Sequence, residues 1–438
     1  MSFTQRNRLG RFFASLILAL VPSLASAVGL LRDADIEYAL GELARPVLSA
    51  AGLSPSRVKI LIVDDAALNA FVVDQNYIFI HSGLLLRTTT PEMLQAVVAH
   101  EAAHIANGHF ARRIQNVQAA QSRAALGSIL AIAAGAATGN GKAASGVAFG
   151  INSAATRAFL AHTRSEESSA DKSAMSYLKS SGISGRGMKD TLELFIGQES
   201  LSTSRQDAYV RSHPLSRDRI RAIEATITAL PDTPSDTSAR YWHARAVGKL
   251  AAFSRSPSWT LSRADKSISA DIKHMRKAVA YARQGKIKAA LDEMKNAQAL
   301  RPNDPYLQDL KAELLMRDRQ FSRAAQEYLI AAKMDPKNAL ILAGLGRAQL
   351  ASGQISDALK TLETARARDD RNSSLLRDLG QAYAKAGNGA MASLAAAEGY
   401  ALQGRIKDAK LHANRAAAQL PRGAPSWQRA QDVLSLKE

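Results

Sequence analysis

Two histidines that lie four residues apart are the feature of this sequence that points most directly to chemistry. His100 and His104 enclose Glu101 in the run His-Glu-Ala-Ala-His. Residues four apart share one face of an α-helix, so both imidazoles can reach the same metal ion. The carboxylate of Glu101 lies next to them and can take a proton from a water molecule there. The run therefore predicts a zinc site, with one ion per chain and Glu101 as the catalytic base.

The absence of cysteine narrows the set of ligands. Without thiols there is no disulfide and no thiolate zinc site, so imidazoles and carboxylates must hold the metal. His109 follows His100 by nine residues, which on a continuous helix places it on the opposite face from the predicted site. The glycine and histidine offsets that metzincins use are also missing. The third ligand must therefore come from another part of the chain.

A second predicted helix supplies acidic candidates for that ligand. The run at residues 164–171 contains Glu166, Glu167 and Asp171. Glu166 fits a capping box with Thr163 three residues earlier, which gives it a structural role of its own. The spacing alone leaves Glu166 and Glu167 open as ligands.

Three motifs that follow one another along the chain resemble a single peptidase family. They are His-Glu-x-x-His at 100–104, Glu-x-x-Ala-Asp at 167–171 and His-Pro-x-x-x-x-Arg-Ile at 213–220. Together they look like the peptidases that include the CAAX-prenyl endopeptidase and HtpX. The resemblance extends over nearly all of the chain after residue 27. It implies a zinc-dependent metalloendopeptidase.

The same resemblance implies roles for three residues. Glu167 would be the third zinc ligand, and Asp171 would orient one of the ligand histidines. His213 would lie at the metal, either as a group that stabilises the transition state or as a latch at the position of the catalytic water. Taken by itself, a lone histidine before a proline is an ordinary loop residue.

The elements that must position these residues follow from local patterns. Thr90 and Pro91 form an N-cap and first-turn pair, which begins the helix that carries both histidines. Three β-rich runs predict a small sheet beside the helices, at 58–63, 71–73 and 77–80. An extended peptide substrate would add to this sheet along an edge at 69–73 or 77–80.

The C-terminal part of the chain repeats itself every 34 residues. This interval separates the residues at the predicted turn of each unit, Gly285, Arg319, Gly353 and Gly387. Thirty-four residues is the length of a tetratricopeptide repeat, which consists of two helices joined by a tight turn. The run at 404–409 echoes the run at 353–358 but lies 51 residues later. The last unit is therefore predicted to be a divergent cap.

These patterns define the predicted architecture. The fold class is α+β and mainly helical, with a zincin-type metallopeptidase domain followed by an α-helical tetratricopeptide-repeat solenoid. The predicted parts are a signal peptide at 1–27, the peptidase domain at 28–229, a linker with a bridging helix at 230–266 and the repeat domain at 267–438.

The first 27 residues have the form of a cleavable signal peptide. Three arginines precede an apolar stretch at 12–21, and the small residues at 25–27 form a cleavage site. This pattern predicts export to the periplasm. A later stretch at 124–161 is rich in alanine and glycine and is too short for a clear membrane span. It could cover the cleft as a gate and could also make peripheral contact with a membrane.

The net charge of +18 bears on the partners. Removal of residues 1–27 takes away three arginines and no acid, which leaves the exported chain at +15. The basic residues are spread along the repeats, no nucleic-acid-binding motif is present, and the chain is predicted to be exported. We therefore exclude nucleic acid as a partner and expect attraction to acidic proteins or to anionic membrane surfaces.

Two functions fit these features. A signal peptide, a peptidase domain and repeats in this order resemble the periplasmic proteases of outer-membrane assembly within that family. The first function is therefore a zinc metalloendopeptidase that hydrolyses unfolded or misassembled envelope and outer-membrane proteins, with repeats that recruit it to the assembly machinery. The second is a chaperone or assembly scaffold whose metal site is latched or secondary. A cellular requirement for Glu101 would distinguish the two.

Overall fold

The computed structural model describes residues 29–112, 163–198, 206–214, 216–228 and 233–436. The predicted signal peptide at 1–27 and the predicted gate at 124–161 lie outside these ranges. Within the described ranges, no helix combines the length and the apolar character that crossing a membrane requires.

A four-stranded sheet lies near the N-terminus. Its strands are β1 (Leu30–Leu31), β2 (Lys59–Val63), β3 (Ala70–Val72) and β4 (Tyr77–His81). Their order is β1-β2-β4-β3, in which β2 and β4 are parallel and the other two pairs are antiparallel. The three predicted strands are therefore confirmed. The proposed substrate edge at 77–80 is wrong, because β4 is paired on both sides and only β1 and β3 have an open edge within the described part of the chain.

One face of the sheet packs against α1 (Ala34–Ala50) and α3 (Pro91–Ala106). Alternate residues of the central strands point to this face and are almost completely buried: Ile60, Ile62, Ile78 and Ile80. This alternation follows from the two-residue period of a strand. A buried sheet under α3 gives that helix a rigid base.

Four further helices belong to this part of the fold. They are α8 (Arg164–Ser180), α9 (Arg186–Glu193), α10 (Ala208–Ser212) and α11 (Arg217–Thr228). Helices α8 and α9 pack against α3, and α11 packs against α8 and α9. The approach of α9 to α3 depends on Gly187, because a Cβ atom there would lie 2.2 Å from the carbonyl oxygen of Glu92. A larger residue at position 187 would push α9 away from the start of α3.

From residue 270 onward, the described part of the chain consists of helices that pack as antiparallel pairs. The helices are α14 (Ala270–Arg283), α15 (Ile287–Leu300), α16 (Pro305–Arg317), α17 (Phe321–Met334), α18 (Ala339–Ala351), α19 (Ile355–Arg368), α20 (Ser373–Lys385), α21 (Gly389–Leu402), α22 (Ile406–Ala417) and α23 (Pro425–Leu434). The four predicted turn residues have left-handed φ angles of 61° to 84°. The 34-residue register is therefore confirmed, and Arg319 adopts at 61° the conformation that glycine adopts in the other three turns.

The run at 404–409, which resembles the run at 353–358 but begins 51 residues later, also has a structural explanation. Gly404, at a φ angle of 67°, turns α21 directly into α22. This turn has the form of those inside each earlier repeat, but it lies only half a repeat after Gly387. Helix α21 is thus the second helix of the pair α20–α21 and also the first helix of the pair α21–α22. This double role shifts the 34-residue register by half a repeat.

The two parts of the chain meet along α12 (Thr237–Ser254), which is followed by α13 (Pro257–Ala264). Two buried cations of α12, Arg245 and Lys249, bond to the start of the N-terminal domain. Arg245 lies 2.7 Å from Asp35, and Lys249 lies 2.8 Å from Asp33. Arg245 also forms a bidentate pair with Asp304 at the start of α16. The repeats are therefore joined to the sheet domain through buried charges.

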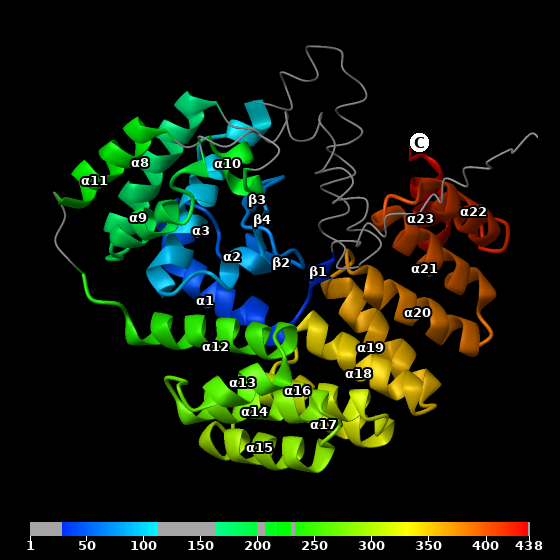
Figure 1. Ribbon diagram of the computed structural model, residues 1–438. Helices are drawn as coiled ribbons and strands as arrows, with labels where there is room; N and C mark the ends of the chain where they lie inside the picture. Colours follow the sequence, from blue (N-terminus) through cyan, green and yellow to red (C-terminus); the bar gives the residue numbers. More distant parts are fainter. Residues whose placement is uncertain (1–28, 113–162, 199–205, 215, 229–232, 437–438) are drawn as a thin grey trace, which may run out of the picture.

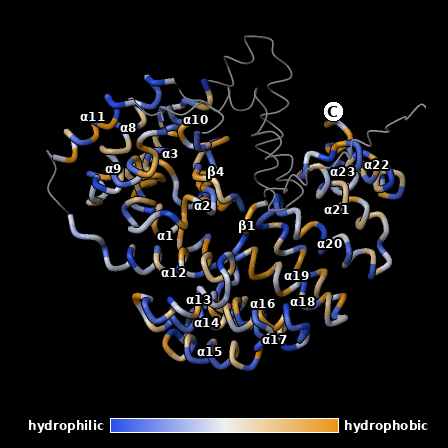
Figure 2. The backbone as a smooth tube through the Cα atoms, viewed as in Figure 1, coloured by the Kyte–Doolittle hydropathy of each residue, from blue (hydrophilic) through white to orange (hydrophobic). Residues whose placement is uncertain are grey.

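The helices from α12 to α23 form an arc below and beside the N-terminal elements, and β1 lies on the inner side of this arc (Figure 1). In Figure 2 the repeat helices alternate between hydrophilic and hydrophobic stretches, the pattern expected of helices that bury one face. The fold is α+β and mainly helical, as the sequence predicts.

Candidate active site

Helix α3 carries the first part of the site. Its N-cap is Thr90, with Pro91 in the first turn, as the sequence predicts. The sheet and the helices α1, α8 and α9 pack around this helix, so His100, Glu101 and His104 are each at least 99% buried. Burial of three polar side chains in one turn is costly unless they are bonded, which marks this turn as a built site.

Helix α8 brings the acidic residues to α3. The predicted capping box is present: the Glu166 carboxylate accepts from the Thr163 backbone N–H at 3.0 Å, and Thr163 Oγ1 accepts from the Glu166 N–H at 3.2 Å. Glu167 follows one position later, turned by about 100° around the helix axis. It is fully buried and faces the histidines of α3.

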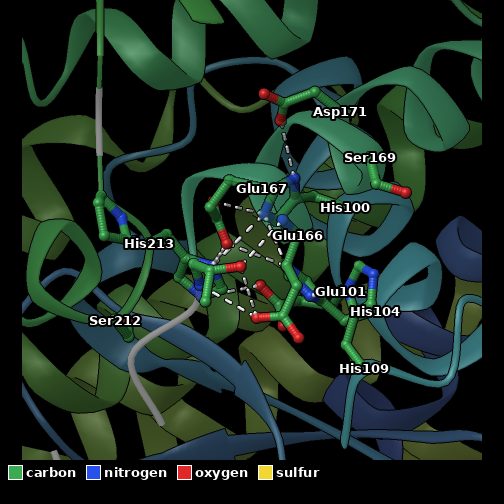
Figure 3. A network of polar contacts seen from close by, with 12 residues as sticks. His100, Glu101, His104, His109, Glu166, Glu167, Ser169, Asp171, Ser212 and His213 are labelled. Atoms are coloured by element: carbon green, nitrogen blue, oxygen red, sulfur yellow. Dashed lines mark hydrogen bonds and ion pairs between the residues drawn. The ribbon is translucent and has the colours of Figure 1, made fainter. Parts of the chain in front are cut away.

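The side chains of His100, His104 and Glu167 converge (Figure 3). The Nε2 atoms of the two histidines are 3.1 Å apart. Glu167 reaches both of them: Oε2 lies 3.4 Å from Nε2 of His100, and Oε1 lies 3.3 Å from Nε2 of His104. The structure therefore brings together the three residues that sequence and resemblance suggested as metal ligands.

His213 enters the same cluster from the end of α10. Its Nδ1 lies 3.1 Å from Glu167 Oε1 and 3.4 Å from Nε2 of His100. On the other side of the ring, Nε2 lies 3.2 Å from the carbonyl oxygen of Ala70 and 3.5 Å from Glu101. His213 thus touches the cluster, the predicted base and the sheet edge at once.

Asp171 and Arg219 support the cluster from behind. Asp171 lies 3.1 Å from Nδ1 of His100, which is the contact expected of a group that orients this ring. Arg219 bonds to Asp171 through two nitrogens, at 2.7 and 2.9 Å, and reaches Glu167 at 2.7 Å. Arg219 is the arginine of the His-Pro-x-x-x-x-Arg-Ile motif, and its contacts here were not predicted from the sequence.

His109 does not lie on the opposite face of α3, and that expectation was wrong. Helix α3 ends at Ala106, and Gly108 adopts a φ angle of 67°, so the nine-residue count crosses a break in the helix. As a result, Nδ1 of His109 lies 2.8 Å from Nδ1 of His104. His109 touches the ring nitrogen that faces away from the cluster.

The electrostatics of the cluster favour ionised carboxylates. Burial alone would raise the pKa of Glu167, but the neighbouring His213 and His100 lower it well below its usual value. Burial likewise opposes the bonds from His100 and Arg219, which lower the pKa of Asp171. Burial alone would lower the pKa of His100, yet these two carboxylates raise it to about 10. The cluster therefore attracts positive charge.

The donor set fits a metal ion. One donor atom from each of His100, His104, Glu167 and His213 lies within 4.8 Å of the others, and all four side chains are buried. Imidazole nitrogens and carboxylate oxygens are the ligands of catalytic metal sites that lack cysteine. A cation at their meeting point would satisfy the negative charge of Glu167 and replace protons on the imidazoles.

Fold and site together define a class of protein: a metalloprotease domain with a buried His-Glu-x-x-His helix, joined to helical repeats. Residues 31–227 match the model described as Peptidase family M48, and residues 315–379 match the model described as Tetratricopeptide repeat. The chain is therefore a metalloprotease that combines a Peptidase family M48 domain with tetratricopeptide repeats. The family expected from the three motifs is confirmed.

Several known proteins are similar to this chain. The chain is 24% identical over 435 residues to the Beta-barrel assembly-enhancing protease (BepA) of Escherichia coli (strain K12), covering 97% of this chain and 86% of that protein. It is 28% identical over 198 residues to the Putative beta-barrel assembly-enhancing protease of Vibrio cholerae, covering 43% and 39%. Among solved structures, YrrB, titled a TPR protein with an unusual peptide-binding site, covers 40% of this chain and 91% of its own at 18% identity and a TM-score of 0.32.

Proposed function

We propose that this protein is a periplasmic zinc metalloendopeptidase that cleaves unfolded or misassembled envelope proteins, including those of the outer membrane. The observation that carries the proposal is the buried cluster of His100, His104 and Glu167 with Glu101 in the same turn of α3. Relatives named for the assembly of β-barrels support the envelope context. The repeats support recruitment to an assembly machinery, because stacked helix pairs present a long concave surface to a partner.

The ligands in this proposal are His100, His104 and Glu167, which would hold one zinc ion. Bound zinc polarises the scissile carbonyl and lowers the pKa of water. Asp171 holds the His100 ring in orientation, and Arg219 holds Asp171 in turn. The orientation of the His100 ring thus depends on two residues outside the ligand set.

Glu101 and His213 carry the proton transfer and the charge stabilisation. Glu101 accepts a proton from the attacking water and later gives it to the leaving amine. The side chain of Glu101 is fully buried, so little bulk water competes for that proton. His213 lies 3.5 Å from Glu101 and can donate a hydrogen bond to the developing oxyanion.

Strand β3 supplies a binding edge for an extended substrate. The N–H of His81 bonds to the carbonyl of Asn69 at 2.9 Å, which makes that pair the hydrogen-bonded one in the antiparallel ladder. In the next position the backbone groups of Ala70 therefore point away from β4, and so do those of Val72. A substrate strand could bond to them and lie across the cluster.

His213 would act as a latch in the resting enzyme. Its Nδ1 side contacts the ligand cluster, and its Nε2 side bonds to the carbonyl of Ala70 on the open edge of β3. Substrate would have to displace both contacts. His213→Ala is therefore expected to change the rate of casein cleavage, upward if the latch dominates and downward if oxyanion stabilisation dominates. An unchanged rate would remove His213 from the site.

The test of the proposed function is the Glu101→Gln variant. It should retain zinc, because the ligands remain, and should cleave casein at least about 100 times more slowly, because the base is lost. Glu166→Gln is the matched control, since it makes the same chemical change in the cap of α8. Full activity of Glu101→Gln would contradict the mechanism.

The contacts of His213 also favour a second candidate function, a chaperone or assembly scaffold whose metal site stays latched. In a strain that lacks the natural protein, Glu101→Gln should fail to restore assembly of outer-membrane proteins if proteolysis is the function. Full restoration by this variant would favour the scaffold.

A further inference from the structure

A large groove lies between strand β1 and the inner helices of the repeats. Its volume is about 590 Å³, within the range of ligand sites. Strand β1 and the first helix of four successive repeats, α14, α16, α18 and α20, contribute to its lining. Neither the metal cluster nor Glu101 contributes to it. Strands β1 and β3 are opposite edges of the sheet, so this groove is separate from the proposed catalytic cleft.

The open edge of β1 faces this groove. The N–H of Asp64 bonds to the carbonyl of Gly29 at 2.6 Å, so that pair is the hydrogen-bonded one and the next pair, Leu30 with Val63, is not. The N–H and the carbonyl of Leu30 therefore point away from β2. Both Leu30 and Leu31 line the groove and are only partly buried. A second extended strand could bond to the backbone there.

Two polar side chains on the opposite wall point into the groove. Asp309 of α16 is 8% exposed, and Tyr328 of α17 is 5% exposed. Among the described residues, neither side chain has a partner within the distance of a hydrogen bond or an ion pair. Gly344 helps to place the tyrosine, because a Cβ atom there would lie 2.4 Å from its ring. The carboxylate and the hydroxyl are therefore available to a ligand in the groove.

The charges around the groove indicate what could satisfy them. Each arginine that lines it already has a partner: Arg32 bonds to Glu37 and Asp369, Arg283 to the carbonyls of Ala252 and Arg255, Arg317 to Glu313 and Arg347 to Asp378. Lys249, behind the wall, is bonded to Asp33. Of the charged side chains described in the lining, the two with neither an ion pair nor a side-chain hydrogen bond are both acids, Asp64 and Asp309. The groove is therefore matched to a ligand that carries positive charge.

We propose that this groove binds an extended basic segment of a protein, which adds as a strand to β1 and places a lysine or arginine side chain against Asp309 and Tyr328. The backbone of Leu30 would supply affinity for any extended chain, and the acid would select the basic one. This inference goes beyond the proposed function, because it concerns a binding site that takes no part in bond cleavage.

The test uses the full-length exported protein with Glu101→Gln, so that the probe is not cleaved. The probe is a fluorescent nine-residue peptide of alternating valine and lysine, compared with one of alternating valine and glutamate. Fluorescence anisotropy should show binding of the lysine peptide and no binding of the glutamate peptide. Asp309→Asn should weaken binding of the lysine peptide at least tenfold. Asp292→Asn, the same change at an exposed site on α15, should leave it unchanged.

A second variant tests the strand addition. Leu30→Pro removes a backbone N–H that points into the groove and spares the bonds between β1 and β2. This variant should weaken binding of the lysine peptide in the same anisotropy assay. When Asp309→Asn and Leu30→Pro are each made in the protein that retains Glu101, both should cleave casein at the normal rate. Normal cleavage would show that these two variants are folded. Equal binding of the two peptides would overturn the proposal, and so would normal affinity of Asp309→Asn in a folded protein.

Discussion

Each histidine of the α3 pair has a contact at the ring nitrogen that faces away from the cluster. His100 meets Asp171 at 3.1 Å, and His104 meets His109 at 2.8 Å. A metal-binding imidazole is held in orientation by such a contact. We therefore expect His109→Ala to lower zinc affinity about 10- to 100-fold in a chelator competition assay. Arg112→Ala, a change at a nearby exposed residue, should leave zinc affinity unchanged. Equal zinc affinities of the two variants would contradict this role for His109.

The residues of the site differ in how far the sequence predicts them. His100, Glu101 and His104 lie within one helical turn, so their spacing alone predicts a shared site. Spacing could not choose between Glu166 and Glu167, because the choice depends on how α8 is rotated against α3. Arg219 and His109 could not be assigned, because one contact spans 48 residues of sequence and the other follows the end of a helix.

At the scale of elements, the strands were predictable and their order was not. Each strand has its own β-rich pattern, but the choice between β3 and β4 as the edge depends on pairing between segments. The 34-residue period likewise predicted the helix pairs, because each turn needs a residue that adopts a left-handed φ angle. The half-repeat turn at Gly404 explains why the period fails near the end.

A buried histidine joins α12 to the sheet domain and makes stability depend on pH. The ring of His243 bonds to Thr88 at 2.9 Å, and burial lowers its pKa to about 4 from an ordinary value of about 6.5. The unfolded chain binds the proton more readily, so this stability is complete above pH about 6.5 and is lost as the pH falls toward 4. Between pH 6.5 and 5 the loss should be about 2 kcal/mol.

Urea unfolding at pH 7 and pH 5 measures this loss. His243→Gln cannot take up the proton, so its free energy of unfolding should fall less between the two pH values than that of the natural protein. His81, which is also buried with a pKa lowered to about 4, should keep part of the dependence in the variant. An unchanged pH dependence in His243→Gln would show that this histidine is not the sensitive group.

At the scale of the whole molecule, buried charges connect the repeats to the sheet domain. Arg245 is 1% exposed and bonds to both Asp35 and Asp304. The sequence predicted a bridging helix in this region but not these pairs, since the residues are far apart along the chain. The pairing fixes the arc of repeats around β1 and so forms the groove.

Removal of one charge from this junction should be costly. Asp304→Asn keeps the cap of α16, because asparagine caps a helix as well as aspartate does, but it leaves Arg245 with one carboxylate partner. The free energy of unfolding should fall by about 3 kcal/mol. Asp318→Asn, at an exposed position, should change it by less than about 0.5 kcal/mol. Chemical denaturation of both variants makes the comparison, and equal stabilities would count against the junction.

The central claim is that His100, His104 and Glu167 hold a catalytic zinc ion, and metal analysis of purified exported protein tests it most directly. The natural protein should contain about one zinc per chain. Glu167→Ala should lose the metal, and Glu166→Ala should keep it, although loss of the α8 capping box should cost about 1 kcal/mol of stability. A natural protein without bound metal, or loss of zinc from Glu166→Ala but not from Glu167→Ala, would contradict the account.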